Sequence, residues 1–446
     1  MKFGMFIGLQ LPRPWYDGDE GRLFNDALDQ VELADRLGLD YVWAQEHHFL
    51  EEYSHSSAPE VFLAACSQRT SRIRLGHGIA VMSPHFNAPA RVAERIATLD
   101  LISGGRVEWG TGESGTRLEL EGFGVDFVDK RPMWAEAVRE CVRMQCLDPY
   151  PGYQGRYFSM PARNVVPKPL QKPHPPLWAA CSNRDSLKLA ARLGMGALTF
   201  AFTDAREARF WVEEYYETFR TECAPIGRAV NPNVAVLNGF MCHRDPEVAL
   251  ARGVEGAQFF AYGLGHYWRD GIHVPGRLNL WQEFKRRPAS EAEAIQRDRK
   301  KAGMGGIGSP AELIDNFRSY EEAGVDQLIL LQQCGNYRQE HVLESLELFA
   351  TEVLPQFKER GAERERRKGL ELAPYIAAAM ERIAPLNALG EVPEVPAYPR
   401  LWAMQGGAAQ DLTPDRRPGM AALWQMQVGG GTGKPVAKDP SPGSER

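Results

Sequence analysis

The sequence lacks any apolar run long enough to cross a membrane. None of its stretches approaches the roughly 18 to 20 consecutive apolar residues that a membrane-spanning helix needs. The first residues, MKFGMFIGLQLP, reach a proline without the apolar segment and small-residue cleavage site of a signal peptide. We therefore expect a cytoplasmic protein that has no contact with membranes.

Paired cysteines and an excess of basic residues are missing as well. The seven cysteines form no C-x-x-C motif and their number is odd, which argues against a disulfide framework and a structural zinc site. The 52 basic and 58 acidic residues leave a net charge of −6, so no basic surface is expected to bind a phosphate backbone. The cysteines are therefore expected to be reduced, and nucleic acid is not an expected partner.

Short β-type runs alternate with longer amphipathic runs along the chain. The eight strand candidates are Phe3–Gly8, Asp40–Gln45, Ile73–Ala80, Arg106–Gly112, Leu177–Cys181, Ala197–Phe200, Asn233–Cys242 and Asp326–Leu331. Helical runs such as LFNDALDQVELADRLG repeat apolar residues at helical spacing and end in a glycine. This alternation predicts an α/β fold, a (β/α)8 TIM barrel, although an open doubly wound sheet has the same pattern. In a barrel, the loops that follow the strands form the active face.

Two regions depart from this alternation. Tyr262–Gly308, after the seventh strand candidate, is longer than an ordinary connection and is predicted to be a lid-like insertion in a barrel of residues 1–358. Its aromatic residues are expected to be exposed: Tyr267, Trp268 and Trp281. Residues 359–446 are predicted to be a charged helix end, GAERERRKG, and then an irregular Pro- and Gly-rich tail. Part of this tail is expected to dock because of its large apolar residues, which are Trp402, Leu423, Trp424 and Met426.

Two adjacent histidines follow the second strand candidate in the stretch DYVWAQEHHFLEEY. Successive side chains of an extended segment point to opposite sides, so His47 and His48 are not expected to face one centre. The H-x-H and H-E-x-x-H spacings are absent, and no metal site is predicted. One histidine at the barrel mouth fits an acid–base role, because imidazole exchanges its proton near neutral pH. The alternative is a pair of loop histidines with ordinary hydrogen bonds.

The stretch GTGESG, Gly110–Gly115, satisfies the G-x-G-x-x-G pattern of dinucleotide-binding proteins. That pattern requires a helix at its third glycine, whereas the following residues are interrupted by Gly122 and Gly124. We interpret these glycines as positions that let a flat group approach the backbone at the end of a strand.

The fifth strand candidate ends at Cys181, and the spacing of Ser182 and Asp185 predicts a capping box that opens the next helix. A helix N-terminus reached directly from a strand is a favourable seat for a phosphate, and Arg184 adds positive charge. The alternative is a capped helix that binds nothing.

Several segments together resemble the bacterial luciferase family of flavin-dependent monooxygenases. They are MKFGMF, VWAQEHHF, LGHGIAV, ATLDLISGGRVEWGTG, RPMWAEAV, GSPAELIDNF and ELFATEVLPQF. The resemblance extends over about Met1–Lys358. It implies a (β/α)8 barrel that binds reduced FMN at its mouth, with the reduced flavin supplied by a separate flavin reductase. The other expected partners are a small organic substrate and O2, and the protein is expected to form a homodimer.

The resemblance also assigns roles to individual residues. His47 would be the acid–base group beside the flavin, and Glu46 a neighbour that contacts or positions it. Gly112 and Glu113 stand where luciferase itself has a Cys-Arg pair. The other cofactor-binding candidates are Gly78 and Ile79 at the flavin ring, Arg131 near the phosphate, Cys181 and Ser182 at the phosphate-binding turn, and Ser186 as a further candidate.

The expected reaction is oxygenation of a small apolar compound through a flavin (hydro)peroxide, either at an aldehyde or ketone or by hydroxylation. Three other functions share the pattern. They are a deazaflavin-dependent hydride-transfer oxidoreductase, a metal-dependent hydrolase on the same barrel, and a non-catalytic flavin-binding subunit. The presence of His47 argues against the last of these.

Overall fold

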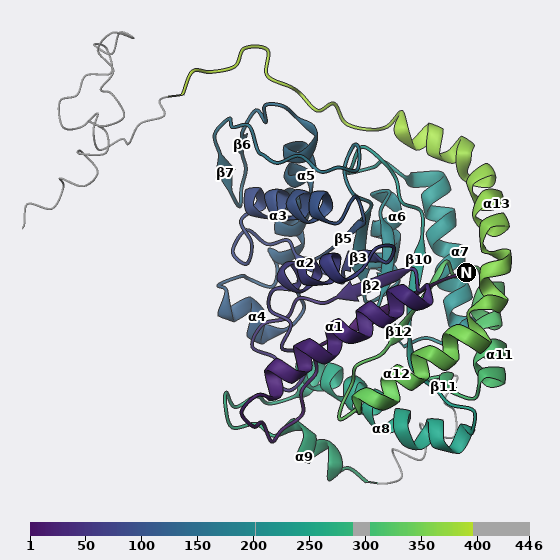
Figure 1. The fold of residues 1–446 in the computed structure, drawn as a ribbon. Coiled ribbons are helices and arrows are strands. Elements are labelled where there is room, and N and C mark those ends of the chain that lie inside the picture. Colours follow the sequence, from purple (N-terminus) through teal and green to yellow (C-terminus); the bar gives the residue numbers. More distant parts are fainter. Residues whose placement is uncertain (201, 289–303, 396–446) are drawn as a thin grey trace, which may run out of the picture. The chain divides into compact units, whose positions relative to one another are not determined.

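The computed structural model describes residues 1–200, 202–288 and 304–395 (Figure 1). Residues Met1–Gly390 form one compact unit. The four apolar tail residues expected to dock, from Trp402 to Met426, lie outside the described residues. Within the described residues, no helix is both long and apolar enough to cross a membrane.

The core of the fold is a closed barrel of parallel strands. In order around the barrel these are β1 (Lys2–Ile7), β2 (Tyr41–Ala44), β3 (Arg74–His77), β5 (Val107–Gly112), β8 (Leu177–Cys181), β9 (Gly196–Thr199), β10 (Val234–Cys242) and β12 (Gln327–Leu331). The barrel closes because β12 pairs with β1 as well as with β10. The predicted (β/α)8 barrel is thus confirmed, and the open doubly wound sheet is excluded.

Each predicted strand corresponds to one strand of the barrel, with one difference in the third. The run expected at Ile73–Ala80 is divided at Gly78 and Ile79, where the peptide bond is cis. It resumes as β4 (Ala80–Val81), which pairs with β5. A further short strand, β11 (Gly306–Gly308), extends the sheet beside β10.

Helices cover the outside of the barrel (Figure 1). The longer ones are α1 (Asp19–Leu37), α2 (Pro59–Arg69), α3 (Pro89–Ile102), α5 (Lys130–Cys146), α6 (Arg184–Arg192), α7 (Ala205–Glu222), α8 (Pro246–Gly265), α11 (Pro310–Glu322), α12 (Gln339–Leu348) and α13 (Pro355–Met380). Shorter elements are α4 (Arg117–Gly122), α9 (Leu280–Lys285), the π-helical turns η1 (His266–Asp270) and η2 (Phe349–Val353), and the hairpin of β6 (Tyr153–Gln154) and β7 (Ser159–Met160).

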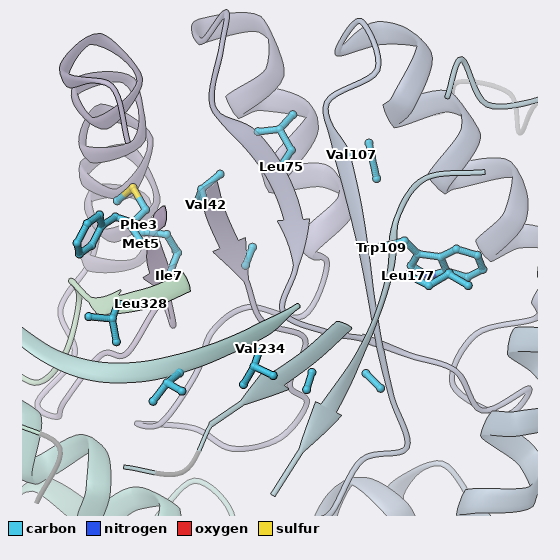
Figure 2. Close-up of a cluster of buried hydrophobic side chains, with 14 of the residues drawn as sticks. Phe3, Met5, Ile7, Val42, Leu75, Val107, Trp109, Leu177, Val234 and Leu328 are labelled. Carbon is cyan, nitrogen blue, oxygen red and sulfur yellow. The ribbon is translucent and has the colours of Figure 1, made fainter. Parts of the chain in front are cut away.

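Alternation along the strands divides the apolar residues into two layers. One set of side chains packs between the strands and the helices, as Figure 2 shows for residues of successive strands such as Met5, Val42 and Leu75. The intervening residues point into the barrel, where Trp43 and Trp178 meet with ring centroids 5.3 Å apart. This is the side-chain period of two that a parallel barrel buried on both faces requires.

Glycines inside the barrel make room for these two indoles. A Cβ atom at Gly76 would clash with the Trp43 ring, and one at Gly196 would clash with the Trp178 ring. Trp178 also donates a hydrogen bond of 2.6 Å from Nε1 to Glu108, a carboxylate inside the barrel. The lower barrel is therefore a packed core, and ligands are restricted to the ends of the strands.

The charged run GAERERRKG was predicted to be a helix end. In the structure it lies in the middle of α13. Its basic residues Arg364 and Lys368 are four positions apart and therefore share one helix face. Arg364 donates to the carbonyl of Val325 at 2.7 Å, and Lys368 contacts buried Asp326 at 2.8 Å. The helix continues because these contacts fix it to the N-terminal end of the barrel, and the boundary expected at residue 358 falls inside it.

The insertion Tyr262–Gly308 is folded where the structure describes it. It contains the end of α8, then η1, α9 and β11, while residues 289–303 lie outside the described part. The expectation that its aromatic residues are exposed is wrong. Tyr267 is only 9% exposed, and Trp268 and Trp281 are half-buried. Tyr267 and Trp268 pack on Tyr53 at the barrel mouth, and Trp281 packs on Phe259 of α8. These contacts lower the apolar surface left in water.

Candidate active site at the barrel mouth

His47 lies in the loop directly after β2, at the end of the barrel where the strands finish. Its Nδ1 atom is 2.9 Å from Oε1 of Glu119. Its ring makes edge contacts with Tyr53 and Trp268, with centroids 5.6 and 5.3 Å away. Within the described residues Nε2 has no hydrogen-bond partner, so this nitrogen is the one available to a ligand.

Glu119, the partner of His47, is completely buried on α4. It accepts hydrogen bonds from the backbone N–H of His48 at 2.9 Å and from the hydroxyl groups of Ser114 and Thr116 at 2.8 Å. Burial alone would raise the pKa of Glu119, but the His47 ring, the His48 backbone N–H and the Thr116 hydroxyl lower it below its ordinary value. Glu119 therefore stays ionised and accepts a hydrogen bond from the Nδ1–H group of His47.

Glu119 was not predicted from the sequence, because Gly122 and Gly124 argue against a helix in this segment, where the structure has α4. The signal was present in the spacing T-x-x-E from Thr116 to Glu119, a capping box that opens a helix. In the structure Thr116 is the N-cap of α4 and accepts from the Glu119 backbone at 3.2 Å. Six residues of helix are enough to bring this carboxylate under His47.

Glu46 and His48 form a second cluster beside the first. Glu46 accepts from the Val81 backbone at 2.7 Å and from the Asn87 side chain at 2.8 Å, and lies 3.2 Å from Nε2 of His48. The side chains of the two histidines thus contact different carboxylates, as expected for neighbours in an extended segment. Glu46 makes no hydrogen bond to His47 in the described part of the chain. There, no group of three or more His, Cys, Asp or Glu side chains could hold a metal ion.

The glycines of GTGESG serve close packing at the mouth. A Cβ atom at Gly112 would lie 2.5 Å from the Ile79 side chain, which covers the end of β5. One at Gly115 would lie 2.6 Å from Nε1 of Trp268. Gly78 and Ile79 therefore lie beside Gly112 at neighbouring strand ends, where the flavin ring is expected.

The predicted phosphate residues converge only in part. Arg131, at the start of α5, binds Glu113 at 2.8 Å, and this hydrogen bond raises the pKa of the guanidinium. It also interacts electrostatically with Asp185, which places it near the start of α6. Beside it, Lys130 donates to the carbonyl of Ser114 at 3.0 Å. The cations Arg131 and Lys130 and the carboxylates Glu113 and Asp185 thus lie at this edge of the mouth.

The capping box of α6 is one residue later than predicted. Asn183, not Ser182, is the N-cap, and its side chain accepts from the Ser186 backbone at 2.9 Å while Ser186 Oγ accepts from the Asn183 backbone at 3.2 Å. Asn183 adopts the extended conformation of an N-cap, and asparagine is among the best capping residues. The hydroxyl of Ser186 is therefore engaged in the cap.

Cys181 and Ser182 differ in their surroundings. The Cys181 thiol is buried in the core, and burial raises its pKa to about 12. Ser182 is exposed in front of the first backbone N–H groups of α6. Of these two residues, only Ser182 presents its side chain to a ligand.

The donor set fits a flavin that carries a phosphate. Arg131, Lys130, the Ser182 hydroxyl and the N-terminus of α6 are suited to an anion. The ring end of the mouth is aromatic and apolar, with Tyr53 and Trp268 beside His47. Glu113 and Asp185 oppose an anion at the phosphate end, and Arg131 would have to be shared between Glu113 and the phosphate.

The sequence of this chain is similar to those of several known proteins. The family described as luciferase-like monooxygenase matches residues 1–327. The oxygenase component of a flavin-dependent trigonelline monooxygenase from Acinetobacter baylyi is 25% identical over 371 residues, covering 82% of this chain and 98% of that protein. A 5,10-methylenetetrahydromethanopterin reductase from Methanopyrus kandleri is 25% identical over 345 residues, covering 74% of this chain and 94% of that protein.

A similar fold occurs among solved structures. A monooxygenase from Streptomyces bottropensis matches with a TM-score of 0.63 and 23% identity, covering 80% of this chain and 100% of that one. At this identity the match supports the fold alone.

Proposed function

Because the chain belongs to the luciferase-like monooxygenase family, we propose that it is a flavin-dependent monooxygenase that uses reduced FMN and O2 to oxygenate a small apolar organic compound. The observation that carries this proposal is the His47–Glu119 pair at the barrel mouth, where the ring of Trp268 packs against His47. A proton-transfer group with one nitrogen fixed and the other free is what such a reaction needs.

The roles of the residues follow from their contacts. Reduced FMN, when bound, supplies two electrons and activates O2. Glu119 holds the proton on Nδ1 of His47, so Nε2 can take a proton from, or return one to, the group against it. Tyr53 and Trp268 exclude water from this nitrogen, which favours transfer to the substrate over loss of the activated oxygen to solvent.

The phosphate end gives a second set of roles. We propose that Arg131, Lys130 and Ser182 bind the phosphate together with the first N–H groups of α6. Ile79 and Gly112 would then support the ring from below. Glu46 accepts a hydrogen bond from the Val81 backbone and contacts the His48 ring. It would therefore hold the end of the third strand in place under the flavin ring.

A deazaflavin-dependent hydride transfer is the second candidate. It is favoured by the relative from Methanopyrus kandleri, which is named a reductase and not a monooxygenase. The His47–Glu119 pair would serve that reaction equally well, because hydride transfer to a carbonyl also needs a proton donor.

Anaerobic titration of the protein with reduced FMN and with a reduced deazaflavin distinguishes the two functions. The monooxygenase proposal predicts tight binding of reduced FMN and at least about tenfold weaker binding of the deazaflavin, which is a difference of about 1.4 kcal/mol. The reverse order would overturn it.

We also propose that a separate flavin reductase supplies the reduced cofactor and that the protein works as a homodimer. Purified protein should then show no NADH or NADPH oxidation with FMN until a reductase is added. Light scattering should give twice the mass of the chain. Oxidation of NADH by the protein alone, or a monomeric mass, contradicts the respective proposal.

A further inference from the structure

The loop after β2 carries more than His47. Three consecutive residues in it, Glu51, Glu52 and Tyr53, each contact a different part of the insertion. Tyr53 packs on Trp268 with ring centroids 5.5 Å apart, and a Cβ atom at Gly263 would lie 2.7 Å from its ring. The loop that holds the proton-transfer residue thus also holds the segment that covers it.

Glu52 is the most deeply buried carboxylate in this contact, at 1% exposure. It accepts hydrogen bonds from the backbone N–H groups of Leu280 and of Trp281, the latter at 3.0 Å, and these are the first two residues of α9. A third bond of 2.8 Å comes from the backbone of Arg13, in the loop after β1. One carboxylate therefore joins two barrel loops to the insertion.

Glu51 fixes the chain between η1 and α9. It accepts from the Gly276 backbone at 2.7 Å and lies 3.2 Å from Nε2 of His273, while Arg13 donates to it at 2.6 Å. Upstream, η1 is continuous with α8. Trp268 is therefore held from both sides, by α8 before it and by Glu51 and Glu52 after it.

We propose that Glu52 is a positioning residue of the site: by binding the start of α9 it keeps residues 262–288 closed over the mouth and Trp268 against His47. The effect of Glu52 on the reaction rests on the function proposed above. The contact itself needs no cofactor. Charge-assisted bonds to backbone N–H groups are stronger than neutral ones, and a buried carboxylate without donors is unfavourable, so the closed arrangement is the stable one.

The test uses Glu52→Gln, which keeps the size of the side chain but removes the charge and leaves only one acceptor oxygen. The matched control is Glu136→Gln. Glu136 is also a buried carboxylate that accepts backbone N–H groups, from Arg156, Tyr157 and Phe158, but it fixes the β6–β7 hairpin. If Glu52→Gln does not fold, Glu52→Asp serves, because the charge is kept while the reach to α9 is shortened.

Two measurements are made on the cofactor-free proteins. Diethyl pyrocarbonate modification, followed by peptide mass spectrometry, reports access to Nε2 of His47, with solvent-exposed His85 as the internal reference. Hydrogen exchange reports opening of the peptide that contains Leu280 and Trp281. For Glu52→Gln we expect at least about tenfold faster modification of His47 and faster exchange in this peptide, with His85 and the barrel strands unchanged. Glu136→Gln should leave His47 unchanged.

Equal modification of His47 in the parent and in Glu52→Gln, or an equal increase in Glu136→Gln, overturns the positioning role. The result is independent of the proposed function, which the flavin titration tests separately. If His47 becomes accessible but reduced flavin does not bind, the positioning role stands and the monooxygenase proposal falls. If both hold, Glu52→Gln should also divert more of the reduced flavin to hydrogen peroxide than the control does.

Discussion

His47 and Glu119 act as a unit because each is defined by the other. The histidine could be predicted from the sequence, since it follows a strand and all strand-following loops of a barrel meet at one face. The carboxylate could not be paired with it, because the two residues are 72 positions apart and only closure of the barrel brings α4 to the end of β2. A sequence pattern identifies which residues are suited to the chemistry, but distance in space selects among them.

Replacing Glu119 with Gln should relax the choice of tautomer at His47. An amide can either accept or donate toward Nδ1, so the preference for a proton on that nitrogen is lost. Nitrogen-15 NMR of the imidazole is expected to show predominantly the Nδ1–H form in the parent protein at neutral to alkaline pH and a mixture in Glu119→Gln. Glu121→Gln, an exposed neighbour on the same helix, is the control and should match the parent. An unchanged tautomer in Glu119→Gln would show that something else orients the ring.

His77 gives a prediction for stability against pH. It points away from the barrel interior into a buried cluster, and burial lowers its pKa to about 4. The unfolded chain binds this proton near the ordinary value of about 6.5, so acid favours the unfolded state between these two pH values. The stability is complete above about pH 6.5 and is lost as the pH falls toward 4.

His77→Asn removes this titration. The difference in unfolding free energy between parent and variant, measured by urea denaturation, should change in favour of the variant from pH 7 to pH 4. A difference that is constant over this range contradicts the assignment.

At the scale of the elements, the starts of α5 and α6 form the proposed phosphate seat. The sequence predicted a helix cap after β8 but assigned it to Ser182, because S-x-x-D and N-x-x-S overlap within one turn. Only the backbone conformation separates them, and Asn183 is the residue that is extended.

Arg131→Ala should weaken the binding of FMN by about tenfold or more and leave the binding of riboflavin within about twofold, because only FMN offers a phosphate to the guanidinium. Arg184→Ala is the matched control, since Arg184 lies on α6 but is paired with Glu214. Fluorescence titration measures the affinities of the parent and of both variants for FMN and for riboflavin. Equal losses for FMN and riboflavin would place the phosphate elsewhere.

The helix α13 shows why a charged run was misread. Composition predicts a solvated helix end. In the structure, however, Arg364 donates to the carbonyl of Val325 and Lys368 to Asp326, at the N-terminal end of the barrel. Lys368→Met should lower the unfolding free energy by roughly 1.5 to 3 kcal/mol, because Asp326 is 5% exposed and loses its cation. Arg366→Met, in the exposed part of the same run, should change it by less than about 0.5 kcal/mol. Equal effects in urea denaturation would rule out an anchoring role for Lys368.

For the whole molecule, the barrel was the expected fold because its strands are short, apolar and separated by helices in eight repeats. The open sheet, which has the same pattern, was excluded only by the pairing of β12 with β1. The insertion was recognised by its length, but its aromatics were misjudged. Sequence alone does not say that Tyr53 and Trp268 meet across more than two hundred residues. Long-range packing at the mouth is the feature that periodicity cannot supply.

The central claim is that the mouth binds reduced flavin and protects its reaction with O2. It is tested most directly by stopped-flow absorbance, in which the protein loaded with reduced FMN is mixed with oxygenated buffer. The account predicts a transient absorbance that belongs to neither reduced nor oxidised FMN, and its decay should be faster in Glu52→Gln than in Glu136→Gln. Direct conversion to oxidised FMN at the rate of the free flavin, with no transient in the parent protein, would contradict it.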